Sequence, residues 1–292
     1  MALVRRTRIL LSVLQELGGD LANRRMQNLL FLYCKENVKR DDYYEFIQFI
    51  EGPCSIQAEE DKAFLIRKKV LESSDRWVLA STSFRYAIDL DFFEKIAIQE
   101  LKNKWTLKSD DDIEQFIAAH YPILRSGTST PGLYTIGYEG LSPEAYINAL
   151  LQRGIKLLVD VRKNAFSQKF GFSKSELTRI LNRSGIEYRH IPELGIDSDK
   201  RQALVLQSDY DSLFKTYVRD TLPKQTESLD HLFNLVVEQQ RVAITCFEAD
   251  PDHCHRSHVA HALKSRADFP YRIEHLMPCN HLKRQKLNTR RY

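Results

Sequence analysis

The stretch Leu157-Leu158-Val159-Asp160-Val161-Arg162 decides the fold of the second half of the chain. Its apolar residues follow one another without the alternation of a strand that faces water on one side. A continuous apolar run of this length is typical of a strand in a parallel sheet with both faces covered. Two charged side chains, Asp160 and Arg162, stand at its end, where such sheets bind ligands.

Other apolar runs of strand length surround this stretch, and helices with marked starts separate them. Ser142-Pro143-Glu144 supplies an N-cap serine, a first-turn proline and an acid, and Ser173 opens another helix. Alternating strands and helices indicate a three-layer α/β domain with a largely parallel, Rossmann-like sheet. The predicted strands are 133–136, 157–161, 187–191, 241–246 and 271–276, and the later predicted helices are 213–222, 228–239 and 257–265.

The first part of the chain is mainly helical. Apolar spacing predicts helices over 5–17, 21–36, 55–72 and 92–101, a strand over 43–49 and one arm of a short hairpin at 76–80. Gly52-Pro53 is expected to break the chain between them. The words at 29–33 and at Gly52-Pro53-Cys54-Ser55 resemble winged-helix-like domains associated with antitoxin-type proteins.

Arginines in this part have two interpretations. They can contact phosphates of a nucleic acid, or they can lie on solvated helix faces. The residues concerned are Arg5, Arg6, Arg8, Arg24 and Arg25.

The length of 292 residues suggests two domains at the usual ~100–200 residues per domain. The small polar run Ser126-Gly127-Thr128-Ser129-Thr130-Pro131-Gly132 predicts a linker. We therefore expect a helical domain at 1–125, a linker at 126–132, an α/β domain at 133–279 and a basic tail at 280–292. The tail can bind a polyanion or be a solvated terminus; its basic residues are Lys283, Arg284, Lys286, Arg290 and Arg291.

Bulk composition narrows the class of protein. Hydrophobic residues make up 43% and charged residues 28%, as in ordinary globular proteins, and the net charge of +4 permits a polyanionic partner without requiring one. Five irregularly spaced cysteines do not form a disulfide framework. The sequence shows no secretory signal and no apolar run of about 18 residues, so we expect a cytoplasmic protein without a membrane segment. Composition gives no oligomeric state.

Each of three predicted strands is followed by a short polar segment, which we call a polar word. The first gives Gly137-Tyr138-Glu139-Gly140, the second Asp160-Val161-Arg162, and the third Cys246-Phe247-Glu248, followed by Cys254-His255-Arg256. If the strands are neighbours, all these words meet in one crevice at the carboxyl edge of the sheet. Each word also has a structural interpretation, as a turn, an ion pair or a buried cysteine.

The residue types suggest several chemistries. Either Cys246 or Cys254 can be a nucleophile beside His255, with Asp160 or Glu248 as general acid or base. Arg162, Arg256 and the start of the helix expected near Ser257 can hold an anionic group. Zinc is a further alternative, but the spacing of Cys246, Cys254, His255 and His258 fits no standard ligand pattern, so no metal is assigned and no cofactor is identified.

The loop 163–173 after the second polar word is basic and aromatic. Phe166, Phe170 and Phe172 can stack on a base or simply hold the loop on the sheet. Ser167 in this loop is a candidate ligand-binding residue, together with Gly137, Tyr138 and Glu139.

These words together resemble the DUF488 family over about residues 133–277. The resemblance rests on Thr135-Ile136-Gly137-Tyr138, Asp160-Val161-Arg162 with Ser167, Tyr188-Arg189-His190 with Leu194-Gly195, and Cys246-Phe247-Glu248 with Cys254-His255-Arg256. It implies the fold and the positions of the site and supplies no reaction. Members often carry proline after the Asp-x-Arg word, where this chain has Asn164 and Ala165.

We therefore expect an enzyme that acts on a nucleotide, nucleoside or nucleic-acid base. The alternative is a ligand-sensing or nucleic-acid-binding regulatory module without catalysis, with DNA or RNA bound through the N-terminal domain and the basic tail. A third interpretation, a structural partner or toxin–antitoxin component, rests on the N-terminal resemblance alone.

Overall fold

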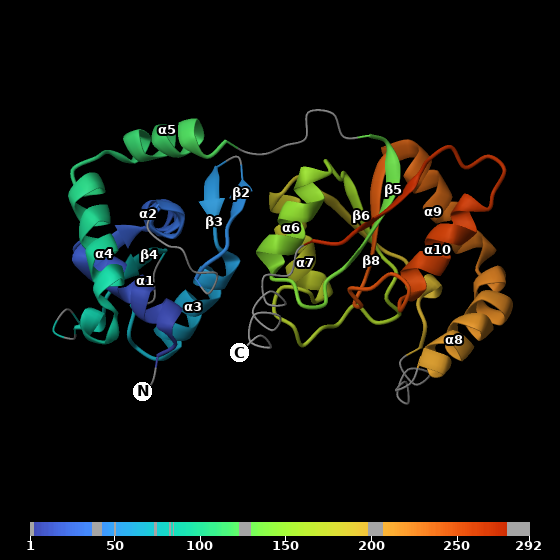
Figure 1. Ribbon diagram of the computed structural model, residues 1–292, viewed down its shortest axis with the longest axis horizontal. Coiled ribbons are helices and arrows are strands. Elements are labelled where there is room, and N and C mark those ends of the chain that lie inside the picture. The colour runs from blue at the N-terminus through green and yellow to red at the C-terminus, as the bar shows by residue number, and fades with distance from the viewer. Residues whose placement is uncertain are drawn as a thin grey trace, which may run out of the picture. The chain divides into compact units, whose positions relative to one another are not determined.

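The computed structural model describes residues 3–36, 43–49, 51–72, 75–81, 83, 85–122, 130–197 and 207–278. The chain divides into two compact units, Met1–Ile123 and Leu124–Tyr292, which Figure 1 shows in blue to green and in green to red. Most of the expected linker at 126–132 and all of the expected tail at 280–292 lie outside the described residues. None of the helices within these ranges is long and apolar enough to cross a membrane.

The N-terminal unit consists of helices packed around one core, together with two small antiparallel sheets. Helices α1 and α2 pack against α4 around buried side chains such as Leu10, Leu29 and Leu101. The winged-helix-like character expected for this unit stays a prediction. Its elements are α1 (Arg5–Glu16), β1 (Asp20–Ala22), α2 (Asn23–Glu36), β2 (Ile47–Phe49), β3 (Gly52–Cys54), α3 (Ile56–Arg67), β4 (Arg76–Val78), η1 (Tyr86–Asp89), α4 (Phe92–Trp105) and α5 (Asp110–His120).

Strand pairing in this unit differs from the sequence-based expectation. Gly52-Pro53 was expected to interrupt secondary structure. In the structure β3 begins at Gly52 and pairs with β2 to form a hairpin. Gly52 has φ +121°, a conformation that favours glycine. The strand at 76–78 pairs with β1, whose Leu21 lies opposite Trp77. Local pattern cannot reveal such a partner more than 50 residues away in the sequence.

Helix α5 was not predicted, although its start is marked. Ser109 is its N-cap, and the side chains of Ser109 and Asp112 cap each other's backbone N–H groups. The acidic run 110–112 is thus the first helical turn, where carboxylates stabilise the positive end of the helix dipole.

The N-terminal arginines lie in ion pairs within their own unit, which neutralises their charge locally. Arg25 also donates to the carbonyl oxygens of Trp105 and Lys108. The pairs are Arg5 with Asp91 and Glu94, Arg6 with Asp61, Arg8 with Asp89, Arg24 with Glu114, and Arg25 with Asp110.

The C-terminal unit contains the expected parallel sheet. Its strand order is β7-β6-β8-β5-β9, and every described pairing is parallel. The elements are β5 (Gly132–Gly137), α6 (Pro143–Gln152), β6 (Leu157–Asp160), α7 (Lys174–Arg183), β7 (Glu187–His190), η2 (Pro192–Leu194), α8 (Gln207–Thr216), a π-helical turn η4 (Tyr217–Thr221), η5 (Leu222–Lys224), α9 (Thr226–Gln239), β8 (Arg241–Cys246), α10 (His255–Lys264) and β9 (Ile273–Leu276).

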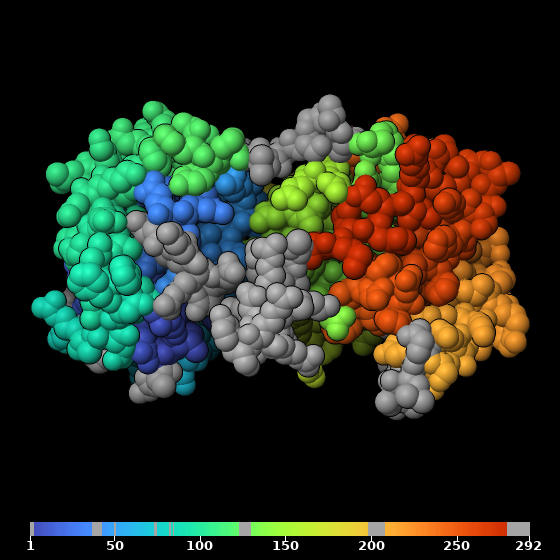
Figure 2. Space-filling view, in the orientation of Figure 1, coloured from blue at the N-terminus to red at the C-terminus, as the bar shows by residue number. Residues whose placement is uncertain are grey.

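Helices cover both faces of this sheet (Figure 1). The connections β5 to β6 and β6 to β7 run in one direction along the sheet, and those from β7 to β8 and β8 to β9 run in the other. Right-handed crossovers therefore put α6 and α7 on one face and α9 and α10 on the opposite face. In the space-filling view, segments coloured orange to red, which include α8 and α10, occupy much of the visible face of this unit beside earlier segments in green (Figure 2).

The change of direction falls between β5 and β8, which are neighbours. At such a switch point the two outgoing chains separate to opposite faces and leave a crevice at the carboxyl ends of the strands. Val159 and Ile244 are among the side chains that fill the core below it. The fold therefore brings the polar words after β5 and β8 to the place where α/β sheets bind ligands.

Candidate functional site

The three polar words meet at one edge of the sheet. Strands β6, β8 and β5 are adjacent and parallel, so their carboxyl ends lie together. In the register of these strands, Gly137 lies opposite Cys246, and Asp160 lies opposite Thr245. The convergence that the sequence suggested is therefore present in the structure.

Cys246 and His255 form the centre of this edge. The Sγ atom of Cys246 lies 3.6 Å from Nδ1 of His255, and both side chains are fully buried. Nε2 of His255 lies 2.9 Å from the carbonyl oxygen of Val161. Because a carbonyl oxygen only accepts, Nε2 carries a hydrogen. In the neutral form of the ring, Nδ1 therefore presents its lone pair to the thiol.

Cys254 is the N-cap of α10, which begins at His255 and not near Ser257 as expected. Burial raises the pKa of Cys254 well above its ordinary value, and hydrogen bonding to Cys246 raises it further. The Sγ atom that lies within 3.6 Å of His255 Nδ1 is that of Cys246. This contact makes Cys246 the better candidate for a thiolate.

Glu248 is a half-buried carboxylate beside the thiol. Its Oε2 atom accepts a hydrogen bond from Sγ of Cys246 at 3.2 Å. Its backbone carbonyl oxygen accepts a hydrogen bond from Nη1 of Arg256. Glu248 is thus the acidic side chain of the predicted set that touches the thiol and also reaches solvent.

Asp160 and Arg162 form a buried, bidentate ion pair. Nε of Arg162 lies 2.9 Å from Oδ1 of Asp160, and Nη2 lies 2.6 Å from Oδ2. Oδ2 also accepts from the hydroxyl of Tyr188 at 2.8 Å. Burial opposes the charge of Arg162, but its bonds to Asp160 outweigh burial and raise its pKa. The pair is therefore charged and internally satisfied.

The remaining donors of Arg162 bind neighbouring loops. Nη1 donates to the hydroxyl of Tyr138 at 2.7 Å, and Nη2 donates to the carbonyl oxygen of Phe172 at 3.0 Å. Its own carbonyl oxygen lies 2.8 Å from Nε2 of His190. Through these hydrogen bonds, Arg162 links the segments after β5 and β6 to the end of β7.

Arg256 plays a similar part beside Cys246. It is fully buried, and its guanidinium donates to the carbonyl oxygens of Glu248 and, at 2.9 Å, Ala249. Its Nε lies 3.4 Å from Oγ1 of Thr135, which lies 2.8 Å from Nδ1 of His275. In this conformation both arginines expected to hold an anion bind protein acceptors.

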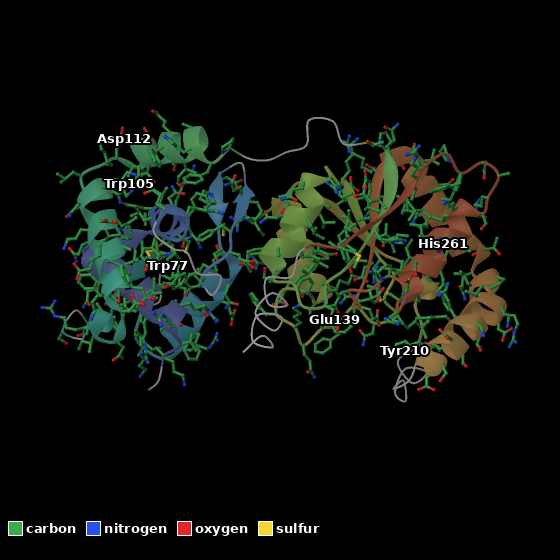
Figure 3. The ribbon with its side chains drawn as sticks, in the orientation of Figure 1. Trp77, Trp105, Asp112, Glu139, Tyr210 and His261 are labelled. Atoms are coloured by element: carbon green, nitrogen blue, oxygen red, sulfur yellow. The ribbon has the colours of Figure 1, made fainter. Side chains whose placement is uncertain are left out.

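The polar word at the end of β5, residues 137–140, contacts the loop after β8. A Cβ on Gly137 would lie 1.8 Å from the carbonyl oxygen of Glu248, so this approach requires glycine. The Oε2 atom of Glu139, labelled in Figure 3, accepts from the backbone N–H of Ala249 at 2.9 Å. The ring of Tyr138 is buried and stacks on Phe172 at 4.4 Å between centroids.

Ser167 has a structural role in the loop after β6. Its hydroxyl accepts from the N–H of Lys169, and its carbonyl oxygen accepts from the hydroxyl of Ser173. Phe172 is buried, whereas Phe166 is 68% exposed. Phe247, between Cys246 and Glu248, is 42% exposed. Two aromatic side chains near this edge are therefore available to a ligand.

Sequence reasoning from residue type missed some partners of the site. Tyr188 donates to Asp160 from within β7, and Lys169 donates from the loop after β6 to the carbonyl oxygen of Tyr138 at 2.8 Å. Tyr188 belongs to one of the segments on which the family resemblance rests, and nothing else in the sequence pointed to it. Val161 contributes through its backbone, which no side-chain pattern can reveal.

The same centre contains the side chains best suited to a metal ion. The ligand atoms of Cys246, Cys254 and His255 lie within 4.8 Å of one another. Two thiols and an imidazole are ligands that Zn²⁺ accepts, but both thiols must first lose their protons. The raised pKa of Cys254 opposes that loss.

Comparison with known protein families agrees with the family resemblance seen in the sequence. Residues 142–263 match the sequence profile of a family described as domain of unknown function DUF488. Searches of curated proteins and of solved structures found no match. The matched range runs from the N-cap of α6 into α10 and includes β6, β7 and β8 with their polar words. The C-terminal unit of this chain is therefore similar to the DUF488 family over residues 142–263, and the description of that family assigns no function.

Proposed function

We propose that the C-terminal unit is an enzyme that acts on a nucleotide, a nucleoside or a nucleic-acid base, with Cys246 as nucleophile. The observation that supports this most strongly is the 3.6 Å approach of His255 Nδ1 to Cys246 Sγ. A thiol beside an imidazole of fixed tautomer can give up its proton to the ring nitrogen and become a thiolate.

Each neighbour has a defined task in this proposal. His255 takes the proton at Nδ1, and the Val161 carbonyl oxygen stabilises the resulting imidazolium through Nε2. The proton of Cys254 and the N-terminus of α10 stabilise the thiolate. Glu248 accepts from the thiol in this structure; once His255 has taken the thiol proton, the carboxylate is released from that bond and exchanges a proton with the substrate. Asp160, Arg162 and Arg256 are positioning residues that hold the surrounding loops.

The aromatic side chains support the proposed substrate class. Phe247 and Phe166 expose their rings on the loops after β8 and β6. A base can stack on such rings whatever its identity, which is the usual way proteins hold unpaired bases.

Access to the thiol requires movement of the segment 247–253. Cys246, Cys254 and His255 are at most 1% exposed. The segment is tied to the loop after β5 by two bonds, from Glu139 N to Phe247 O and from Ala249 N to Glu139 Oε2. A substrate that enters must replace these contacts.

The test is a product search with the full chain. Nucleotides, nucleosides, bases and short oligonucleotides are incubated with the protein and analysed by liquid chromatography and mass spectrometry. We expect a new product that Cys246→Ser abolishes and Cys34→Ser leaves unchanged. Cys34 is a matched control because burial raises its pKa to about 12. Equal product with Cys246→Ser would refute the nucleophile.

The alternative is a ligand-sensing or nucleic-acid-binding regulatory module. The same experiment separates the two functions, since a sensor binds a member of the panel and returns it unchanged. We further propose that the protein works in a reducing cytoplasm. This agrees with the free thiols of the described cysteines, including the neighbouring Cys246 and Cys254.

A further inference from the structure

The side chains of Cys246, Cys254 and His255 form a cluster with the composition of a metal centre. Within the described parts of the chain, it is the one group of three or more thiol, imidazole or carboxylate side chains whose ligand atoms all lie within 4.8 Å of one another. Two thiolates and an imidazole are a ligand set that Zn²⁺ takes up in proteins. The spacing of the three residues in the sequence fits no standard ligand pattern, and the fold alone brings them together.

The distances in this cluster fit one tetrahedral ion. Sγ of Cys246 lies 3.6 Å from Nδ1 of His255. A sulfur and a nitrogen on the same tetrahedral Zn²⁺ are also about 3.6 Å apart, because their bonds to the ion measure about 2.3 and 2.0 Å. Two sulfur ligands on that ion are about 3.8 Å apart. Since the three ligand atoms already lie within 4.8 Å of one another, Cys254 needs to move by no more than about 1 Å.

The second ring nitrogen of His255 has the partner that a metal-binding histidine usually has. Nε2 lies 2.9 Å from the carbonyl oxygen of Val161 and donates to it. In metal centres the ring nitrogen that does not bind the ion commonly donates to a carbonyl or carboxylate oxygen, which fixes the tautomer and the orientation of the ring. This contact is independent of the two thiols, and it directs the lone pair of Nδ1 toward them.

Hydrogen bonds from the start of α10 hold the loop that separates the two cysteines. The N–H of Cys254 donates to the carbonyl oxygen of Pro251 at 3.2 Å, and the hydroxyl of Ser257 donates to the same oxygen at 2.6 Å. Nη2 of Arg256 donates to the carbonyl oxygen of Ala249 at 2.9 Å. None of these bonds uses a sulfur or imidazole ligand atom, so the loop conformation that brings the ligands together does not depend on an ion.

We propose that Cys246, Cys254 and His255 bind one thiolate-binding divalent cation such as Zn²⁺, and that the bound ion takes the thiolate of Cys246 out of reaction. The ion displaces both thiol protons, and the two thiolates then neutralise its charge inside the protein. Mg²⁺ and Ca²⁺ are excluded, because they prefer oxygen ligands. The effect on reactivity rests on the proposed function of Cys246, whereas the binding of the ion needs only the three ligands.

The burial of the cluster is that of a closed metal site. Each of the three ligand residues is at most 1% exposed, as is usual where an ion has only protein ligands. The ion enters through the movement of the segment 247–253 that access to the thiol requires in any case. Glu248 in this segment accepts from Sγ of Cys246 at 3.2 Å, and its carboxylate is an oxygen ligand at hand for the fourth position of the ion.

The probe is Cd²⁺, titrated into the reduced full chain and followed by the ultraviolet absorption of cadmium–thiolate bonds. We expect a band that saturates at one equivalent and that Zn²⁺ removes but Mg²⁺ does not. Cys254→Ser should weaken binding by about a hundredfold or more, because the loss of a ligand costs more than the loss of a residue that only orients one. Cys34→Ser, which removes a free thiol of the other unit, is the control and should leave the band unchanged.

Protection of the thiols in the unaltered protein gives a second readout that does not depend on the folding of a variant. One equivalent of Zn²⁺ should slow the labelling of Cys246 and Cys254 by iodoacetamide about tenfold or more, because a metal-bound thiolate is a poor nucleophile, and a chelator should restore the rate. Absence of the band, a band unchanged in Cys254→Ser, or labelling that Zn²⁺ leaves unchanged would each overturn the proposal. A product that Cys246→Ser leaves unchanged would refute the nucleophile but not the ion site.

Discussion

Gly137 and Glu248 approach so closely that a Cβ on residue 137 would lie 1.8 Å from the carbonyl oxygen of Glu248. The contact joins the end of β5 to the loop that covers Cys246. Backbone atoms form it on both sides, so no side-chain rotation can relieve an added methyl group.

Gly137→Ala should therefore lower the free energy of unfolding of the C-terminal unit by about 3 kcal/mol, the upper part of the range for overpacking. Urea denaturation measures this. Gly185→Ala is the control: nothing lies within 4 Å of its Cβ position, and its φ of +70° predicts a cost of about 1 kcal/mol. Equal costs for the two variants would contradict the close contact.

Asp160→Asn should destabilise the C-terminal unit by about 3–5 kcal/mol, because it leaves the buried charge of Arg162 unpaired. Adding Arg162→Leu should cost less than the sum of the single changes. The exposed pair of Glu187 and Arg189, at 3.7 Å, is the control, and Glu187→Gln should change stability by no more than about 0.5 kcal/mol. Additive costs at 160 and 162 would argue against the pair.

The stability of the C-terminal unit should fall as the pH is lowered from about 6.5. Burial lowers the pKa of His275 below its ordinary value, and the charge of Arg256 lowers it further. Burial also lowers the pKa of His258. In this window the unfolded chain binds more protons than the folded chain, so acid favours unfolding until the folded-state pKa is passed.

The measurement is the urea midpoint at a series of pH values from 8 to 5. His275→Gln should flatten the curve in that window, since the amide does not titrate. His231→Gln is a control, because His231 is exposed on α9. An unchanged curve for His275→Gln would show that other groups control the dependence.

Nucleic-acid binding through the N-terminal unit and the basic tail stays a prediction. Arg24 and Arg25 are paired with Glu114 and Asp110, so we expect their replacement by alanine to weaken DNA or RNA binding less than replacing the five basic residues of 280–292. Gel shifts over a salt series test this, since phosphate contacts weaken as salt rises. No shift with any DNA or RNA would remove nucleic acid as a partner.

Much of the fold could be predicted because its signals are local. The continuous apolar runs at 157–161 and 241–246 identify buried parallel strands, and Ser142 and Ser173 mark helix starts. The pairing of β1 with β4 depends on tertiary packing and has no local signal. The start of α10 was placed two residues late because a cysteine, Cys254, occupies the N-cap position.

The location of the site could be predicted from the sequence, but the contacts among its residues could not. Strand ends determine where Asp160 and Cys246 lie, and parallel neighbours bring them to one edge. The partners of Arg162 and Arg256 include backbone carbonyl oxygens of Phe172, Glu248 and Ala249. Such contacts depend on loop conformation, which residue types do not specify.

In the proposed function, His255 activates Cys246 and not Cys254. The direct measurement is the rate at which iodoacetamide labels each cysteine, followed by peptide mass mapping. The two thiols are equally buried, so a difference in rate reports on the thiolate and not on access.

The matched variant is His255→Gln, whose amide can still donate to the Val161 carbonyl oxygen but has no basic nitrogen. His253→Gln, at a half-exposed histidine of the covering loop, is the control. We expect faster labelling of Cys246 than of Cys254, and a fall of about tenfold or more in the rate at Cys246 in His255→Gln but not in His253→Gln. Faster labelling of Cys254, or an unchanged rate at Cys246 in His255→Gln, would show that His255 does not activate Cys246.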